Sequence, residues 1–160
     1  PDATVIANMT GTTPAAWNDP VKGSEITKAQ INQGADVVYA AAGGTGVGVL
    51  QTAADEGILS IGVDSNQNHL HPGKVLTSML KRVDVAVYDA MMAGEDLEVG
   101  EVVTLGLAEE GVGVAIDEHN QDLVTEEMKA AVDEARQKII DGEIKVVSYY
   151  ENDSCPALDF

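Results

Sequence analysis

The sequence predicts an α/β domain built on a mostly parallel sheet that is flanked by helices. Short apolar runs of β-forming residues alternate with amphipathic segments along the chain, which is typical of parallel strands buried under helices. Turn-forming residues stand between many of these segments. A chain of 160 residues with 44 % hydrophobic content is long enough for one compact core and too short for two ordinary domains.

The first part of the chain predicts a strand-helix-strand-helix-strand unit. We expect strands over residues 3–9, 36–42 and 58–63, and helices over about 19–33 and 45–56. Asp19 followed by Pro20 favours a helix start, because Asp caps the first turn and Pro fits the first helical position. Gly34 and Gly57 suit the two helix ends, where glycine readily adopts the left-handed conformation.

The second part begins with a polar loop and continues with further strands and helices. We expect strands over 75–80, 101–107, 112–116 and 144–149, and helices over 83–93 and about 125–140. The last helix has the clearest pattern, because its apolar residues recur at helical spacing and Gly142 follows its end. Residues 151–160 form a polar tail that we expect to be loosely held.

Charge and composition exclude several classes of function. Nine basic residues against 27 acidic ones give a formal net charge of -18, which repels phosphate backbones and argues against a nucleic-acid partner. No apolar run approaches the roughly 20 residues that a membrane-spanning helix needs. Cys155 is the only cysteine, so no disulfide can form within the chain, and no pattern beside it suggests an activating base.

A glycine-rich turn joins a predicted buried strand to a predicted helix at Gly43 and Gly44. Such a turn can offer backbone N–H groups to a ligand. The dinucleotide-binding fingerprint requires a third glycine, and counting from Gly44 that place is taken by Val49, so the fingerprint is not met. The alternative is that these glycines serve only a tight turn and close helix packing.

Two charged residues stand where predicted strands end. Asp64 follows the strand 58–63, and Lys81 follows the strand 75–80. Ligands of open α/β sheets gather outside the carboxyl ends of the strands, where a carboxylate can accept hydrogen bonds from vicinal hydroxyls such as those of ribose. The alternatives are that Asp64 caps a turn and that Lys81 is an ordinary solvated charge.

Other candidate residues are an aromatic and a histidine pair. Trp17 is the only tryptophan, and in its loop it is either a core residue or a stacking surface for a flat ligand. His69 and His71 could contribute to a metal site, but a third ligand is not evident in the pattern. A Gly-x-Ser-x-Gly elbow is absent, and we expect no catalytic residue, no metal and no cofactor.

Five segments in order resemble the basic membrane protein family. The segments are Trp17–Pro20, Gln33–Val37, Ala40–Gly46, Ile61–Asp64 and Val75–Lys81. Members of this family are substrate-binding components of ABC importers, and many are lipoproteins. The resemblance implies a type I periplasmic-binding-protein fold of two lobes, with purine nucleosides as the best-known ligands and an ABC permease as partner. It also implies a periplasmic or extracellular location with a lipid anchor.

The resemblance suggests a role for each candidate binding residue. Trp17 would lie beside the base, Gly43 and its neighbour Gly44 would offer backbone to the ligand, and Asp64 and Lys81 would hold the ribose hydroxyls. Asn66 departs from the acidic residue expected after Ser65.

The same resemblance implies a division of the chain. Residues 1–116 would form the ligand-binding C-terminal lobe, and residues 117–160 would be a returning segment in contact with a first lobe that precedes this chain. A fragment of this kind could self-associate through the exposed helix 125–140 and the hinge surface. Two other functions stay open, a dinucleotide-dependent enzyme domain that uses the glycine turn and Asp64, and a sugar-sensing regulatory domain.

Overall fold

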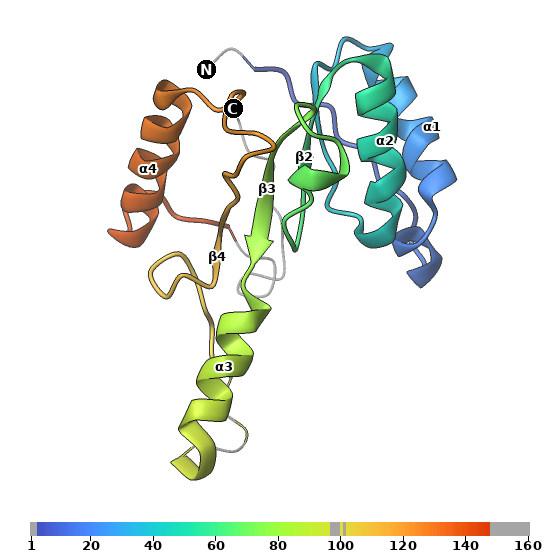
Figure 1. Cartoon of the computed structure of the whole chain (residues 1–160). Coiled ribbons are helices and arrows are strands. Elements are labelled where there is room, and N and C mark those ends of the chain that lie inside the picture. Colours follow the sequence, from blue (N-terminus) through green and yellow to red (C-terminus); the bar gives the residue numbers. More distant parts are fainter. Residues whose placement is uncertain (1–2, 97–99, 101, 148–160) are drawn as a thin grey trace. The chain divides into compact units, whose positions relative to one another are not determined.

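The computed structural model describes residues 3–96, 100 and 102–147 (Figure 1). The chain divides into two compact units. One consists of Ile6–Thr125 and contains the sheet, and the other consists of Pro1–Val5 together with Glu126–Phe160.

The larger unit is organised around a sheet of four strands, β1 (Val37–Tyr39), β2 (Leu59–Gly62), β3 (Val75–Lys81) and β4 (Val112–Val114). They lie in the order β1-β2-β3-β4. β1 pairs with β2 and β2 with β3 in parallel, whereas β4 is antiparallel to β3. The predicted fold class, a mostly parallel sheet flanked by helices, is therefore confirmed.

The start of one helix of this unit and the end of the next lie where the sequence indicated, whereas the first of them ends at Ile31, before the expected residue 33. Helix α1 (Pro20–Ile31) starts at proline, and the side chain of Asp19 accepts a hydrogen bond from the backbone N–H of Lys22 at 2.9 Å. Helix α2 (Gly46–Glu56) ends at Gly57, which has the left-handed φ of 81°. Local capping chemistry therefore sets both helices.

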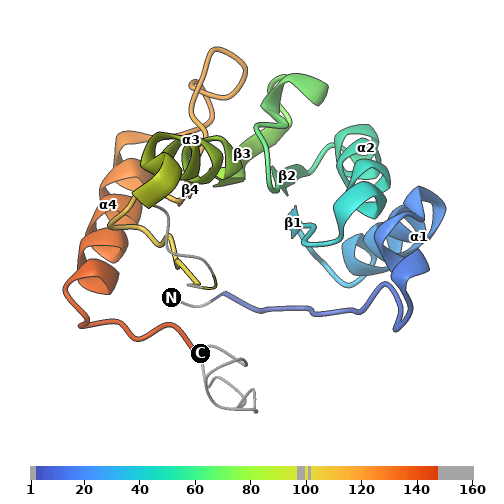
Figure 2. The same cartoon turned by 90° about the horizontal axis from the view of Figure 1, so that it is seen from below.

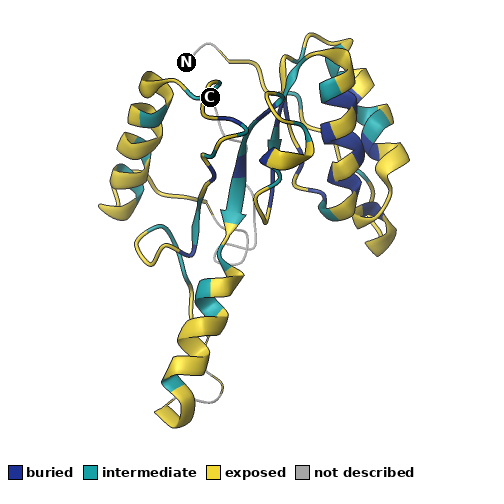
Figure 3. Ribbon diagram, in the orientation of Figure 1, coloured by how far each residue is buried: buried dark blue, intermediate teal, exposed yellow. Residues whose placement is uncertain are grey.

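The core lies where α2 packs on the parallel strands. Val49 and Ala53 of α2 form a buried cluster with Val38 and Ala40. Figure 2 shows α2 beside β1 and β2, and Figure 3 shows the buried part of α2 in dark blue. Helix α1 packs on α2 at very short range. A Cβ at Gly48 would lie only 1.9 Å from the carbonyl oxygen of Pro20, so this close approach requires glycine.

Two further helices are confirmed at the predicted places but bury nothing. Helix α3 (Val83–Ala93), in the larger unit, and helix α4 (Glu126–Ile140), in the smaller one, contain no buried residue (Figure 3). Short 3-10 turns complete the described structure: η1 (Pro14–Trp17), η2 (Gly43–Thr45), η3 (Asn68–Leu70) and η4 (Gly94–Asp96). No helix among the described residues is long and apolar enough to span a bilayer.

Several predicted strands are corrected by the structure. Residues 3–9, 102–107 and 144–147 are not strands, and the remainder of the strand expected over 144–149 lies outside the described residues, as do the tail 151–160 and Cys155. A β-forming run becomes a strand only when a neighbouring strand satisfies its backbone groups. In the described structure the sheet begins with β1, and the apolar side chains of Val5, Met9, Val102 and Val103 are exposed.

Candidate ligand-binding site

Asp64 and Lys81 form an ion pair at the carboxyl ends of neighbouring parallel strands. Asp64 lies two residues after β2, and Lys81 is the last residue of β3. The ammonium nitrogen Nζ of Lys81 lies 2.9 Å from Oδ1 of Asp64. The side chain of Lys81 is 60 % exposed, and that of Asp64 is 51 % exposed. The predicted location of both residues at one edge of the sheet is therefore seen, and both retain a surface that a ligand could reach.

The backbone holds the same two residues together a second time. The N–H of Lys81 donates to the carbonyl oxygen of Asp64 at 2.8 Å. Asp64 itself has a φ of 68°, a left-handed conformation that Asp tolerates better than most residues. The carboxylate is thus presented from a fixed and sparsely populated backbone geometry.

The electrostatics of the pair favour a charged lysine. Hydrogen bonding to Asp64, followed by the attraction of its charge, raises the pKa of Lys81 above its ordinary value. A carboxylate accepts hydrogen bonds and an ammonium group donates them, and each has capacity beyond the single contact between them. Such a pair can bind two adjacent hydroxyl groups, because each hydroxyl can both donate and accept.

Trp17 packs against the glycine turn of Gly43 and Gly44, which follows β1. Trp17 ends the turn η1, and the residue is 60 % exposed. A Cβ at Gly43, whose φ is 54°, would lie 3.1 Å from the carbonyl oxygen and 3.4 Å from ring atom Cε3 of Trp17. A Cβ at Gly44 would lie 3.3 Å from the same carbonyl oxygen of Trp17. The indole is therefore a surface residue packed over the glycine turn rather than a core residue.

Thr45 fixes this arrangement, and the sequence analysis did not identify it. Its hydroxyl accepts from the N–H of Asp19 at 2.7 Å and donates to the carbonyl oxygen of Ala16 at 2.7 Å, and the side chain is fully buried. The loop that carries Trp17 is thereby tied to the turn that carries Gly43. The sequence shows only that a hydroxyl residue stands within the glycine turn. Its hydrogen-bond partners lie 26 and 29 residues away, so no local pattern indicates them.

The Asp64–Lys81 ion pair and the glycine turn that contacts Trp17 lie at the same edge of the sheet. Parallel pairing matches Tyr39 of β1 with Ile61 of β2, so the chain leaves both strands at the same end. Gly43 follows β1, Asp64 follows β2 and Lys81 ends β3. This is the edge at which open α/β sheets bind ligands.

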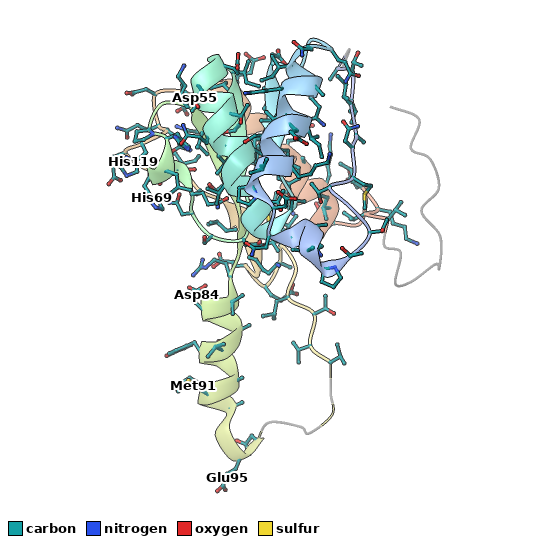
Figure 4. All side chains as sticks on the ribbon, turned by 90° about the vertical axis from the view of Figure 1, so that its right-hand side faces the viewer. Asp55, His69, Asp84, Met91, Glu95 and His119 are labelled. Carbon is teal, nitrogen blue, oxygen red and sulfur yellow. The ribbon has the colours of Figure 1, made fainter. Side chains whose placement is uncertain are left out.

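The histidine pair does not belong to a group of potential metal ligands among the residues that the structure describes. The one such group there consists of Asp117, Glu118 and His119 and lacks both His69 and His71; Figure 4 labels His69 and His119. Asp117 already accepts hydrogen bonds from Asn66 and Asn68 and from the backbone of His119. These bonds, that of Asn66 first, lower the pKa of Asp117. A structural role accounts for this carboxylate.

Residues 1–149 match the family described as ABC transporter substrate-binding protein PnrA-like. The match covers most of the chain, and the chain therefore belongs to this family. The resemblance that five sequence segments suggested is confirmed.

Relatives carry names that agree with this assignment. The chain is 37 % identical over 145 residues to a CD4+ T-cell-stimulating antigen of Listeria monocytogenes, covering 78 % of this chain and 39 % of the relative. It is 35 % identical over 153 residues to the ABC transporter nucleoside-binding protein BmpA of Lactococcus lactis, covering 83 % and 42 %. Identity to basic membrane protein D of Borreliella burgdorferi is 31 % over 147 residues, covering 89 % and 42 %. Relatives from two Pyrococcus species are described as lipoproteins.

A solved structure shares the fold. An ABC transporter solute-binding protein from Aeropyrum pernix superposes with a TM-score of 0.70 at 31 % identity, covering 86 % of this chain and 47 % of the other. The chain thus spans less than half the length of the relatives that it matches.

Proposed function

We propose that this chain supplies one ligand-binding lobe of the substrate-binding component of an ABC importer, and that its ligand is a purine nucleoside or a similar ribose-containing solute. The observation that carries the proposal is the exposed ion pair of Asp64 and Lys81 at the carboxyl edge of the sheet. Two groups with acceptors and donors side by side match the vicinal hydroxyls of a ribose.

The aromatic side chain supports the other half of such a ligand. Trp17 presents more than half of its surface at the same edge, next to the glycine turn. A purine is flat and apolar on its faces, so it would stack on the indole while the ion pair forms hydrogen bonds with the ribose hydroxyls. The name of the Lactococcus relative, a nucleoside-binding protein, points in the same direction.

The remaining contacts would come from outside this chain. Small ligands bind with most of their surface buried, and the chain spans about two fifths of the curated relatives. We therefore infer a second lobe that closes over the ligand, an ABC permease as partner, and a lipid-anchored location outside the cytoplasm, consistent with the relatives that are described as lipoproteins.

Titration calorimetry on a complete two-lobed protein containing this segment tests the ligand class. We expect binding of adenosine, guanosine or inosine and none of NAD. Binding of NAD without any nucleoside binding would replace the proposal with the dinucleotide-dependent alternative.

Asp64→Asn tests the role of the carboxylate. Asn tolerates the left-handed backbone of this position, so the substitution changes the charge with little added strain. Replacing two charge-assisted hydrogen bonds by neutral ones should weaken nucleoside binding on the order of 10²-fold. A free purine base lacks the ribose, so its affinity should not change. Equal losses for both ligands would show that Asp64 organises the pocket and does not read the sugar.

A further inference from the structure

The backbone at Asp64 is strained, and neighbouring contacts must stabilise this conformation. The N–H of Ser65 donates to the carbonyl oxygen of Val63 at 2.8 Å, and Asp64 between them has a φ of 68°. A hydrogen bond across one residue with a positive φ at its centre is a strained γ-turn, which is rare in proteins. Conformations of this kind persist only where surrounding contacts over-determine them.

Gln67 supplies such contacts to both sides of the turn. Its side-chain oxygen Oε1 accepts from the N–H of Val63 at 2.8 Å, directly before the turn. Its own backbone N–H donates to the hydroxyl of Ser78 on β3 at 3.0 Å. Ser78 is fully buried and donates in turn to the side chain of Asn68, which is fully buried as well. Gln67 therefore links the end of β2 to a buried network on β3.

The last residue of β2 leaves room for this side chain. A Cβ at Gly62 would lie 2.9 Å from both Cβ and Oε1 of Gln67 and 2.7 Å from the hydroxyl oxygen of Ser78. Real Cβ atoms do not approach other atoms so closely, so glycine at this position is what allows Gln67 to fold back over the strand end.

We propose that Gln67 is a positioning residue, which holds the γ-turn at Asp64 so that its carboxylate faces Lys81 and the ligand. The hydrogen bonds to Val63 and Ser78 fix the chain on both sides of the turn, and the Lys81 backbone secures the Asp64 carbonyl from β3. The effect on ligand binding rests on the proposed function, whereas the effect on the backbone does not.

Hydrogen exchange in the 160-residue chain tests the backbone effect without any ligand. Gln67→Met keeps the length of the side chain and removes the acceptor. The amide of Ser65, whose N–H closes the turn, should therefore exchange at least several-fold faster, together with that of Val63. Gln67→Glu keeps an acceptor oxygen and should restore protection. Gln51→Met is the matched control, because Gln51 lies exposed on α2 and its side chain, among the described residues, bonds to that of Asp55. Unchanged exchange at Ser65 in Gln67→Met would overturn the proposal.

Calorimetry on the complete two-lobed protein tests the consequence for binding. Gln67→Met should lower adenosine affinity about three- to tenfold, the range of one ordinary hydrogen bond, and leave adenine affinity unchanged. In an Asp64→Asn background the same substitution should cause no further loss, because Gln67 acts through the carboxylate. An equal loss in both backgrounds, or a loss for adenine as well, would overturn it.

The two proposals fail in different ways. If the unsubstituted protein binds no nucleoside, the proposed function is wrong, and the exchange rate at Ser65 still decides whether Gln67 holds the turn. If nucleosides bind and Gln67→Met behaves like the Gln51→Met control, only the positioning role is wrong.

Discussion

Helices α2 and α3 have the same length, and their burial is opposite. Each has 11 residues and follows a strand of the parallel sheet. In α3 (VDVAVYDAMMA) nine of the 11 residues are hydrophobic, against five in α2 (GVGVLQTAADE). Yet six residues of α2 are buried and none of α3 is. The less hydrophobic helix carries the core.

The difference lies in what surrounds each helix. α2 returns over β1 and β2 and is flanked by α1, so its inner side meets apolar atoms on two sides. α3 leaves the end of β3, and Figure 1 shows its ribbon extending away from the sheet of the same unit. In Figure 4 the labelled side chains of Asp84 and Met91 also lie away from that sheet. Hydrophobic composition predicts that a segment can be buried, whereas tertiary structure decides whether it is.

The largest expected contrast comes from shortening one apolar side chain in each helix. Leu50 of α2 is 1 % exposed, and Leu50→Ala should cost about 2 to 5 kcal/mol of unfolding free energy through lost burial and a cavity. Met91 of α3 is 76 % exposed, and Met91→Ala should change it by less than about 0.5 kcal/mol. Denaturant unfolding monitored by Trp17 fluorescence measures both. A comparable cost for both variants would show that α3 is packed in solution.

Adding a single methyl group gives the next largest contrast. Gly48→Ala puts a Cβ against the Pro20 carbonyl and forces α1 away from α2, which should cost about 1 to 3 kcal/mol. Gly113→Ala is the control, because a Cβ there would meet no heavy atom of the described residues within 4 Å beyond those of its two chain neighbours. If Gly48→Ala were neutral in the same unfolding experiment, the close contact of α1 and α2 would not contribute to stability.

Local signals and long-range contacts explain which parts of this structure could be predicted. The capped start of α1 and the glycine end of α2 were predictable because residues within one helical turn decide them. The location of Asp64 and Lys81 at strand ends on one edge was predictable, since parallel strands end at one edge, whereas their ion pair was not part of the prediction. The missing strand over residues 3–9 depended on a partner, and the roles of Thr45 and Gln67 depend on side-chain hydrogen bonds that no spacing reveals.

Acidification should destabilise α3 and leave α2 unchanged, because an ion pair contributes to α3 whereas burial stabilises α2. Asp84 in the first turn of α3 pairs with Arg82 at 2.9 Å, and this hydrogen bond lowers the pKa of Asp84 below its ordinary value of 3.8. A carboxylate with a lowered pKa contributes stability that is complete above its ordinary pKa and is lost as the pH falls through the lowered value.

The α3 amides should therefore lose protection below about pH 4, while those of α2, held by burial, should keep it in the same range. Hydrogen exchange read residue by residue between pH 5 and 3 provides the measurement. Asp117 loses its own stabilisation in the same direction, so Asp117→Asn serves as the background that removes this contribution. Equal loss in both helices would point to global unfolding instead of a local effect at α3.

The smallest expected effect is that of one hydroxyl placed on α3. Val87 is 52 % exposed, and Val87→Thr exchanges a methyl group that already faces water for a group that water solvates well. The unfolding free energy should change by less than about 0.5 kcal/mol. Val49→Thr makes the same exchange on α2, where the residue is 8 % exposed and the transfer of a hydroxyl out of water should cost about 1 to 3 kcal/mol. Both variants have nearly the same shape and helix propensity as the parent, so their difference reports burial alone. A large cost for Val87→Thr that increases with protein concentration would mean that copies of the chain cover α3 for each other, and light scattering over the same concentrations would detect that association.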